Sequence, residues 1–413
     1  MIQGCFFVSL FSIRMKDVYL DHAATSPLDP RVREVMLPYL DEQFGNPSSF
    51  HTAGKRVKDN VEAARAQIAE QLSVRPDEIL FTSGGTESDN LGILGYARKN
   101  QSAGKHLITT KIEHHAVLEA MLHLEKKEGF EVTYLEPDRE GLITVAQVEA
   151  ALREDTILVS VMYANNEIGT VLPIAEIGNM IQKWRQEHDR PALRFHTDAC
   201  QAGEYLDLNV ERLHVDMLTL NGSKLYGPKG IGLLYLKRGI KLQPLQFGGA
   251  QERALRPGTQ NVPGIIGLAK ALEIAQKNRK AEAERLVPLR EALIEGLQKV
   301  ITKTRLNGHA TERLPNNVNM SFMDVEGEAL LLYLDAQGVY ASTGSACTSA
   351  SLDPSHVILA LGLPYEVAHG SLRFSLGRST TKEDIDYVIE VLPALVEKLR
   401  ALSPVNVDEK YFV

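Results

Sequence analysis

Short apolar runs alternate with amphipathic helical patterns through the first two thirds of the chain. One pattern spaces its apolar residues four, three, four and four apart, which places them on a single helical face. Its members are Val57, Val61, Ala64, Ile68 and Leu72. The apolar runs predict seven buried strands: Ile79–Thr82, Leu107–Thr110, Val132–Leu135, Ile157–Met162, Arg194–Thr197, Met217–Leu220 and Ile231–Leu236. This alternation predicts an α/β fold with a mostly parallel sheet between helices, whose ligands bind at the carboxyl ends of the strands.

The pattern changes after about residue 270. A long amphipathic helix is predicted from Lys280 to Val300, and mixed strands and helices follow it. Thr381 and Asp384 have the spacing of a capping box for the last helix. We therefore predict a large α/β domain, a smaller α+β domain completed by the N-terminal segment, and an unstructured or mis-started extension. The ranges are 27–270 for the large domain, 15–26 plus 271–413 for the small domain and 1–14 for the extension.

Composition excludes several classes of protein. The net charge of −8 gives no basic footprint for nucleic acid. No apolar run reaches the roughly 18–20 residues that a membrane span needs. Three cysteines cannot all pair, and the spacing of Cys5, Cys200 and Cys347 is not a metal motif. A reduced, cytoplasmic setting is therefore expected, with no membrane or direct nucleic-acid partner.

Three polar segments follow predicted strands. Ser83-Gly84-Gly85-Thr86 opens a helix, where free N–H groups and glycines suit an anion, although a plain turn is the alternative. Asp198 ends one strand, either as a site residue or as a helix N-cap. Lys224 follows the next strand among glycines, as a nucleophilic amine or as a surface lysine. Pyridoxal phosphate needs an acid near its ring nitrogen, a lysine for its aldehyde and a cradle for its phosphate, so one site explains all three segments.

Three further residues have functional interpretations. Cys347 lies in a segment of small polar residues, 342–351, which favours an exposed nucleophile over an inert core thiol. His114 and His115 follow a predicted strand, where a ring can stack on a flat cofactor or cap a helix. Arg373 suits a substrate carboxylate, with a structural salt bridge as the equal alternative.

Taken together, these motifs resemble the cysteine desulfurases of the NifS/IscS type, over about residues 18–402. The matching pieces occur in family order. They are Tyr19–Thr25, Asn46–Ser49, Thr82–Asn90, Asn165–Gly169, the Lys224 segment, Arg256–Thr259, the Cys347 segment and Arg373–Arg378. The resemblance implies a fold-type-I transferase that works as a homodimer, with pyridoxal 5'-phosphate as cofactor and L-cysteine as substrate.

The resemblance also implies a role for each site residue. Lys224 holds the cofactor covalently, Asp198 pairs with its ring nitrogen, Gln201 reaches its ring oxygen and His114 stacks on its ring. The phosphate ligands implied are Gly85, Thr86, Asn221 and Ser223, with Thr259 reaching the partner subunit's phosphate. Many family members have Ser-Gly-His where this chain has Asn221-Gly222-Ser223, and both replacements can still donate hydrogen bonds.

The implied reaction removes sulfur from L-cysteine, leaving L-alanine and a persulfide on Cys347. Arg373 and Asn166 bind the substrate. The persulfide passes to an iron–sulfur scaffold protein or another acceptor, for cluster assembly or tRNA thiolation. No resident metal is expected, apart from Cys347 as a transient iron–sulfur ligand.

Two alternatives stay open at this point. Another fold-type-I enzyme, such as an aminotransferase or a selenocysteine lyase, shares much of the pattern, although an aminotransferase has no use for the thiol of Cys347. A catalytically idle sulfur-relay or scaffold protein has no need of Lys224, Asp198 and Cys347 together.

Overall fold

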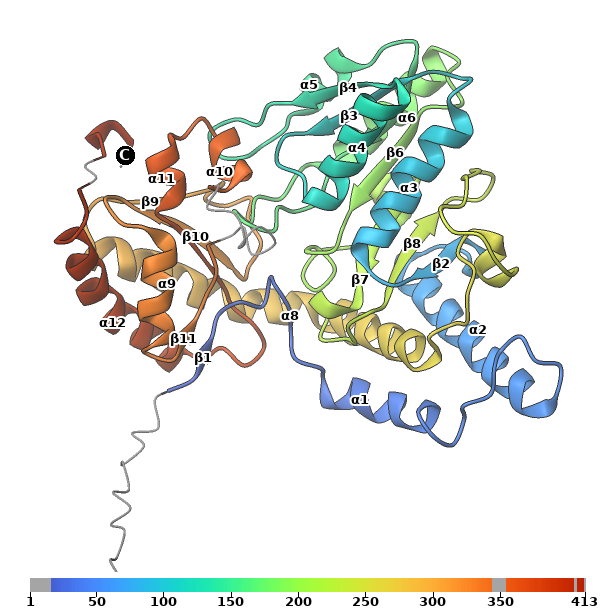
Figure 1. Cartoon of the computed structure of the whole chain (residues 1–413), viewed down its shortest axis with the longest axis horizontal. Coiled ribbons are helices and arrows are strands. Elements are labelled where there is room, and N and C mark those ends of the chain that lie inside the picture. Colours follow the sequence, from blue (N-terminus) through green and yellow to red (C-terminus); the bar gives the residue numbers. More distant parts are fainter. Residues whose placement is uncertain (1–15, 344–353, 405–406, 412–413) are drawn as a thin grey trace, which may run out of the picture.

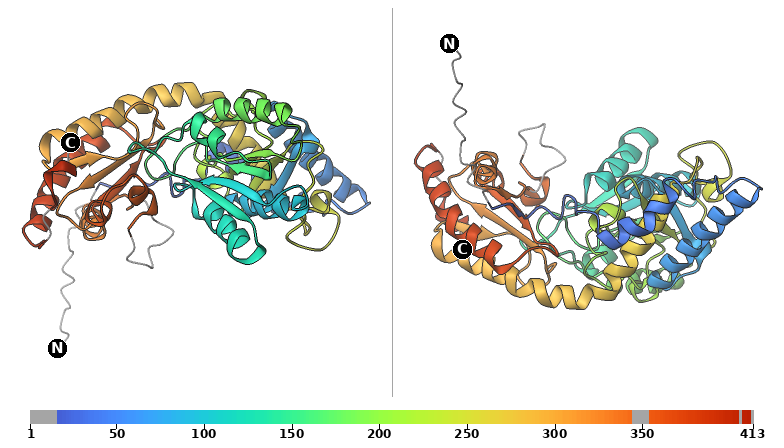
Figure 2. Two further views of the ribbon diagram at one scale, coloured as in Figure 1. Left: turned by 90° about the horizontal axis from the view of Figure 1, so that it is seen from above. Right: turned by 90° about the horizontal axis from the view of Figure 1, so that it is seen from below.

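The computed structural model describes residues 16–343, 354–404 and 407–411. A larger α/β part and a smaller α+β part lie side by side, and one long helix, α8 (Val262–Val300), spans both (Figures 1 and 2). The N-terminal segment runs from the smaller part toward α1 (Pro30–Met36) of the larger part (Figure 1).

The larger part is built on a seven-stranded sheet with the order β2-β8-β7-β6-β5-β3-β4. Its strands are β2 (Ile79–Thr82), β3 (His106–Thr110), β4 (Glu131–Leu135), β5 (Thr156–Ser160), β6 (Arg194–Asp198), β7 (Met217–Asn221) and β8 (Gly232–Leu236). Only β8 runs against its neighbours β2 and β7. The predicted mostly parallel sheet is confirmed, and each expected strand lies within two residues of its predicted bounds at either end.

Both faces of the sheet are buried, because successive side chains of a strand point to opposite faces. In β2, Ile79 and Phe81 join one apolar cluster, while Leu80 joins another on the opposite face. The first cluster also takes the apolar face of α2 (Thr52–Leu72), whose five predicted residues are all buried. The remaining helices of this part are α3 (Gly85–Asn100), α4 (His115–Glu128), α5 (Val145–Ala151), α6 (Ile174–Glu187) and α7 (Val210–Leu213).

The smaller part has its own apolar cluster around an antiparallel sheet of order β12-β10-β9. A short parallel pair joins the N-terminal β1 (Val18–Tyr19) to β11 (Val339–Tyr340). The other elements are β9 (Thr304–Leu306), β10 (Asn317–Phe322), β12 (Ser371–Ser375), α9 (Gly327–Asp335), α10 (His356–Ala360), α11 (Tyr365–His369) and α12 (Lys382–Arg400). The capping box predicted at Thr381 and Asp384 is confirmed.

One helix boundary was wrong. The structure begins α8 at Val262 instead of Lys280, so the helix crosses the change of pattern at residue 270 without a break. The side chain of Asn261 accepts a hydrogen bond from the Gly264 amide at 3.1 Å, and Pro263 lies in the first turn. An N-cap asparagine and a proline in the first turn both mark the start of a helix, so the sequence did contain the information for this boundary.

Candidate active site

A cavity of about 300 Å³ lies where the carboxyl ends of the central strands meet the N-terminal segment and the smaller part. This volume is at the lower end of the usual range for small-molecule sites, about 300–1,000 Å³. Most of its walls come from the segments that follow β2, β3, β5, β6 and β7. The lining residues are Ala23, Ala24, Gly85, Thr86, Asp89, His114, His115, Met162, Ala164, Asn166, Glu167, Asp198, Cys200, Gln201, Asn221, Lys224, His356 and Arg373.

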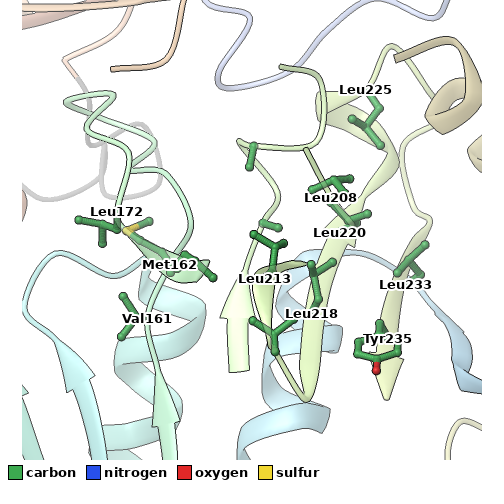
Figure 3. Packing of buried hydrophobic residues seen from close by; sticks show 14 of the residues in the cluster. Val161, Met162, Leu172, Leu208, Leu213, Leu218, Leu220, Leu225, Leu233 and Tyr235 are labelled. Atoms are coloured by element: carbon green, nitrogen blue, oxygen red, sulfur yellow. The ribbon is translucent and has the colours of Figure 1, made fainter. Parts of the chain in front are cut away.

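Lys224 is held by a tight turn at the end of β7. The Asn221 side chain accepts hydrogen bonds from Ser223 Oγ at 2.9 Å and from the Lys224 amide at 3.2 Å. Leu220 and Leu225 flank this turn, and both are completely buried (Figure 3). The apolar packing therefore fixes the backbone on either side of the lysine, whose Nζ donates to the carbonyl of Ala24.

Asp198 ends the neighbouring strand β6 and is almost fully buried. Its Oδ1 accepts a hydrogen bond from the Cys200 amide at 2.9 Å, and no helix begins there. Gln201, on the same turn, donates to the carbonyl of Ala23 at 3.0 Å. The cavity thus brings a carboxylate, an amide and the Lys224 amine together from two adjacent strands.

The N-terminus of α3 forms another wall. Within the described chain no side chain caps this helix, so its first N–H groups remain available to an anion. Gly85 is needed here, because a Cβ at that position would lie 2.9 Å from the sulfur of Cys200. The Thr86 hydroxyl and the Asn221 amide add side-chain donors to the same cavity.

His114 has one of the roles that its sequence position suggested, the helix cap, and it also lines the cavity. Its Nδ1 accepts a hydrogen bond from the Ala116 amide at 3.1 Å, which caps α4, and its ring lines the cavity. His115 also lines the cavity and contacts His356 with ring centroids 4.6 Å apart. Both histidines line the cavity, so the assignment of His114 rather than His115 as the residue that stacks on the cofactor ring stays a prediction.

Arg373 enters from β12 in the smaller part and is almost fully buried. Its Nη2 is 2.9 Å from Asp21 Oδ1, and its Nη1 donates to the carbonyl of Asn166 at 3.0 Å. The salt bridge expected as one alternative is therefore present, and because Arg373 also lines the cavity, its binding of a substrate carboxylate stays a prediction.

Two predicted site residues do not line the cavity of this chain. Ser223 does not line the cavity, and its hydroxyl is engaged with Asn221. Thr259 is exposed, away from the cavity of its own chain. Cys347 lies outside the described residues, as does Cys5.

Sequence reasoning missed a buried group of titratable side chains, of which Asp89 lines the cavity while Glu113 and His196 do not. Burial and the neighbouring Asp198 raise the pKa of Asp89 well above its usual range. Burial lowers the pKa of His196 to about 4 and raises that of Glu113 to about 8. Burial therefore disfavours the charged form of all three side chains. The sequence did contain one indication that Asp89 belongs to the site, because it lies four residues after Gly85 and therefore on the same helical face.

Comparison with known proteins identifies the family. The profile of the class-V aminotransferase family matches residues 18–388. The chain is 53% identical to the cysteine desulfurase IscS of Methanosarcina thermophila, over 96% of both chains. It is 51% identical to the cysteine desulfurase IscS of Dictyoglomus turgidum, over 96% of this chain and 98% of that protein.

The chain belongs to the cysteine desulfurases of the class-V aminotransferase family. The resemblance, the fold class and the enzyme class predicted from the sequence are confirmed. Among solved structures, a NifS-like protein superposes with a TM-score of 0.86 at 36% identity, covering 93% of this chain and all of that one. A structure described as SspA in complex with cysteine gives 0.76 at 38% identity, covering 87% and 98%. Enzymes of this family depend on pyridoxal phosphate and take sulfur from L-cysteine.

The cavity of this desulfurase has the chemistry that such a cofactor requires. It offers an uncapped helix N-terminus with hydroxyl and amide donors for a phosphate, a carboxylate, an amine and a histidine ring. By contrast, no three or more His, Cys, Asp or Glu side chains among residues 16–343, 354–404 and 407–411 are placed to hold a metal ion. No helix within the same ranges is both long and apolar enough to cross a bilayer.

Proposed function

We propose that this cavity binds pyridoxal 5'-phosphate and that Lys224 holds it covalently. The supporting observation is that Lys224, Asp198 and the α3 N-terminus, far apart in sequence, line one cavity of suitable size. Asp198 would pair with the ring nitrogen, Gln201 would reach the ring oxygen, and His114 would stack on the ring. Gly85, Thr86 and Asn221 would take the phosphate, with Ser223 acting through Asn221.

The bound cofactor supplies an electron sink that weakens bonds at the substrate's Cα and Cβ atoms. Lys224, whose amine lies in the same cavity, would take the proton from the substrate's Cα. Buried Asp198, which is oriented by the hydrogen bond from the Cys200 amide, would pair with the ring nitrogen and stabilise a proton there. Arg373 holds the substrate carboxylate, and Asn166 lies beside it in the cavity wall.

Sulfur transfer is assigned to Cys347. Its thiolate attacks the substrate sulfur, the Cβ–S bond breaks, and carbon keeps the bonding electrons and gains a proton. L-cysteine plus the Cys347 thiol thus gives L-alanine plus a persulfide on Cys347. A thiol of an acceptor protein then takes the outer sulfur, for iron–sulfur assembly or tRNA thiolation, in the cytoplasm.

We also propose that the chain works as a homodimer. Large apolar side chains are exposed on the segment between α1 and α2 and on the loop after β8. They are Leu37, Leu40, Phe44, Phe50 and Phe247. Four of these five side chains lie on one short segment, and clustered exposed apolar side chains are typical of a protein interface. Thr259, exposed on its own subunit, would then reach the phosphate of the partner subunit's cofactor.

Sulfide release from L-cysteine with dithiothreitol tests the function. The Cys347→Ser variant should retain the cofactor's visible absorption band and release no sulfide above background. The Cys200→Ser variant is the matched control, because burial raises the pKa of the Cys200 thiol well above its ordinary value and keeps it unreactive. Undiminished release by Cys347→Ser would remove Cys347 from the reaction.

A further inference from the structure

Asp21 is bound directly to the arginine of the substrate site. It follows β1 in the N-terminal segment, and its backbone bridges to Ser375 at the end of β12. Its Oδ1 accepts from Arg373 Nη2 at 2.9 Å, from a position 352 residues away in the sequence. The Asp21 side chain is 20% exposed and that of Arg373 is 3% exposed. The ion pair therefore lies largely out of water, where its charges are poorly screened.

Arg373 keeps unused donor capacity. A guanidinium carries five N–H bonds. Asp21 and the Asn166 carbonyl take one each. Nε is buried and finds no acceptor within the described residues. An unpaired buried donor costs stability, so a ligand that supplies an oxygen there is favoured.

The Asp21 carboxylate stabilises Arg373 when no substrate is bound and opposes the binding of a substrate carboxylate. A buried arginine needs a counter-charge when no substrate is present, and Asp21 supplies it while fixing the orientation of the guanidinium. When a substrate carboxylate binds to the remaining donors, it meets a neutralised arginine and a like charge beside it.

We propose that Asp21 is a positioning residue that fixes Arg373 and limits its affinity for the α-carboxylate of the substrate. This inference rests on the proposed function, in which Arg373 binds the carboxylate. Asp21 is bound to Arg373 and does not itself line the cavity, so its charge acts on substrate binding and not on the chemical step.

The holoenzyme variant Asp21→Asn tests this role, because asparagine keeps the oxygen acceptor for Nη2 and removes the charge. The KM for L-cysteine should fall about threefold or more, with kcat within about twofold of the wild type. The inhibition constant of L-alanine should fall in parallel. That of L-alaninamide, which has no carboxylate, should not change.

Two further variants sharpen the test. Asp17→Asn is the control, since Asp17 lies on the same segment, accepts from Tyr340 Oη at 2.9 Å and is not part of the cavity wall. It should leave every constant unchanged. If Asp21→Asn does not fold, Asp21→Ser can replace it, because serine has a short uncharged oxygen acceptor. The same changes in KM and in the inhibition constants are expected for this variant.

An unchanged or raised KM in a folded Asp21 variant would overturn the role of Asp21. So would an equal gain in affinity for L-alanine and L-alaninamide, because the charge would then act on something other than the carboxylate. A wild-type protein that neither releases sulfide from L-cysteine nor binds L-alanine would instead refute the proposed function itself.

Discussion

The Nζ of Lys224 donates to the backbone carbonyl of Ala24, which lies 200 residues earlier in the chain. Ala24 belongs to the N-terminal segment that pairs with the smaller part through β1 and with the larger part through Ser26. Ser26 Oγ donates to the carbonyl of Ser223 at 2.9 Å, next to the lysine. The N-terminal segment therefore helps to fix the lysine that both parts of the molecule surround.

Replacing Lys224 by alanine should abolish the cofactor's visible absorption band and reduce turnover by about 10²-fold or more, because both the covalent tether and the proton acceptor are lost. Absorption spectra after dialysis measure the first effect. Lys229→Ala is the control, since its Nζ lies 3.5 Å from the Ser26 carbonyl and outside the cavity wall. A band that survives in Lys224→Ala and vanishes in Lys229→Ala would reassign the tether.

The buried pair between Arg65 and Glu252 should be important for stability. Arg65 donates from both Nη atoms to Glu252 at 2.8 Å, and Glu252 also accepts from the Phe81 amide at 3.0 Å. Glu252→Ala should lower the free energy of unfolding by about 3–5 kcal/mol, because it leaves a buried guanidinium without its partner. Denaturant unfolding measures this loss.

Glu62 provides a matched comparison, since it pairs with the same arginine at 3.2 Å but is half exposed. Glu62→Ala should cost under about 1 kcal/mol. If Glu252→Ala and Glu62→Ala lowered the free energy of unfolding equally, burial would not be what makes one ion pair of Arg65 stronger than the other.

Glu113 should make stability depend on pH. Burial raises its pKa from 4.5 to about 8 in the folded protein, so the folded state holds a proton that the unfolded state has lost. The contribution of Glu113 to the free energy of unfolding is therefore fully present below pH 4.5 and is lost as the pH rises through about 8. Glu113→Gln cannot ionise, so its unfolding free energy relative to the wild type should rise on the order of 1–2 kcal/mol between pH 6 and 8. A difference that stays constant over that interval would mean that Glu113 is already ionised in the folded protein.

Local pattern was enough to predict the strands and the residues at their ends. Asp198 follows its apolar run directly and Lys224 lies in the turn after the next one, and parallel strands bring their carboxyl ends to one edge. The start of α8 at Val262 was missed because glycines at 264 and 267 weaken the helical pattern there. The cap at Asn261 was the stronger signal.

Contacts between distant segments had no sequence signature. Asp21 meets Arg373 only because β1 and β12 are brought together in the smaller part. Asp89, Glu113 and His196 come from three separate elements, and their shifted pKa values arise from burial that only the folded chain creates. The predicted division into two domains at residue 270 stays a prediction.

Mass spectrometry of the holoenzyme after brief exposure to L-cysteine tests the central claim most directly. One additional sulfur atom should be found on the peptide that contains Cys347, removable by dithiothreitol and absent in Lys224→Ala. Sulfur located on the Cys200 peptide instead, or no added sulfur while L-alanine accumulates, would contradict the assignment of Cys347 as the residue that carries sulfur away from the substrate.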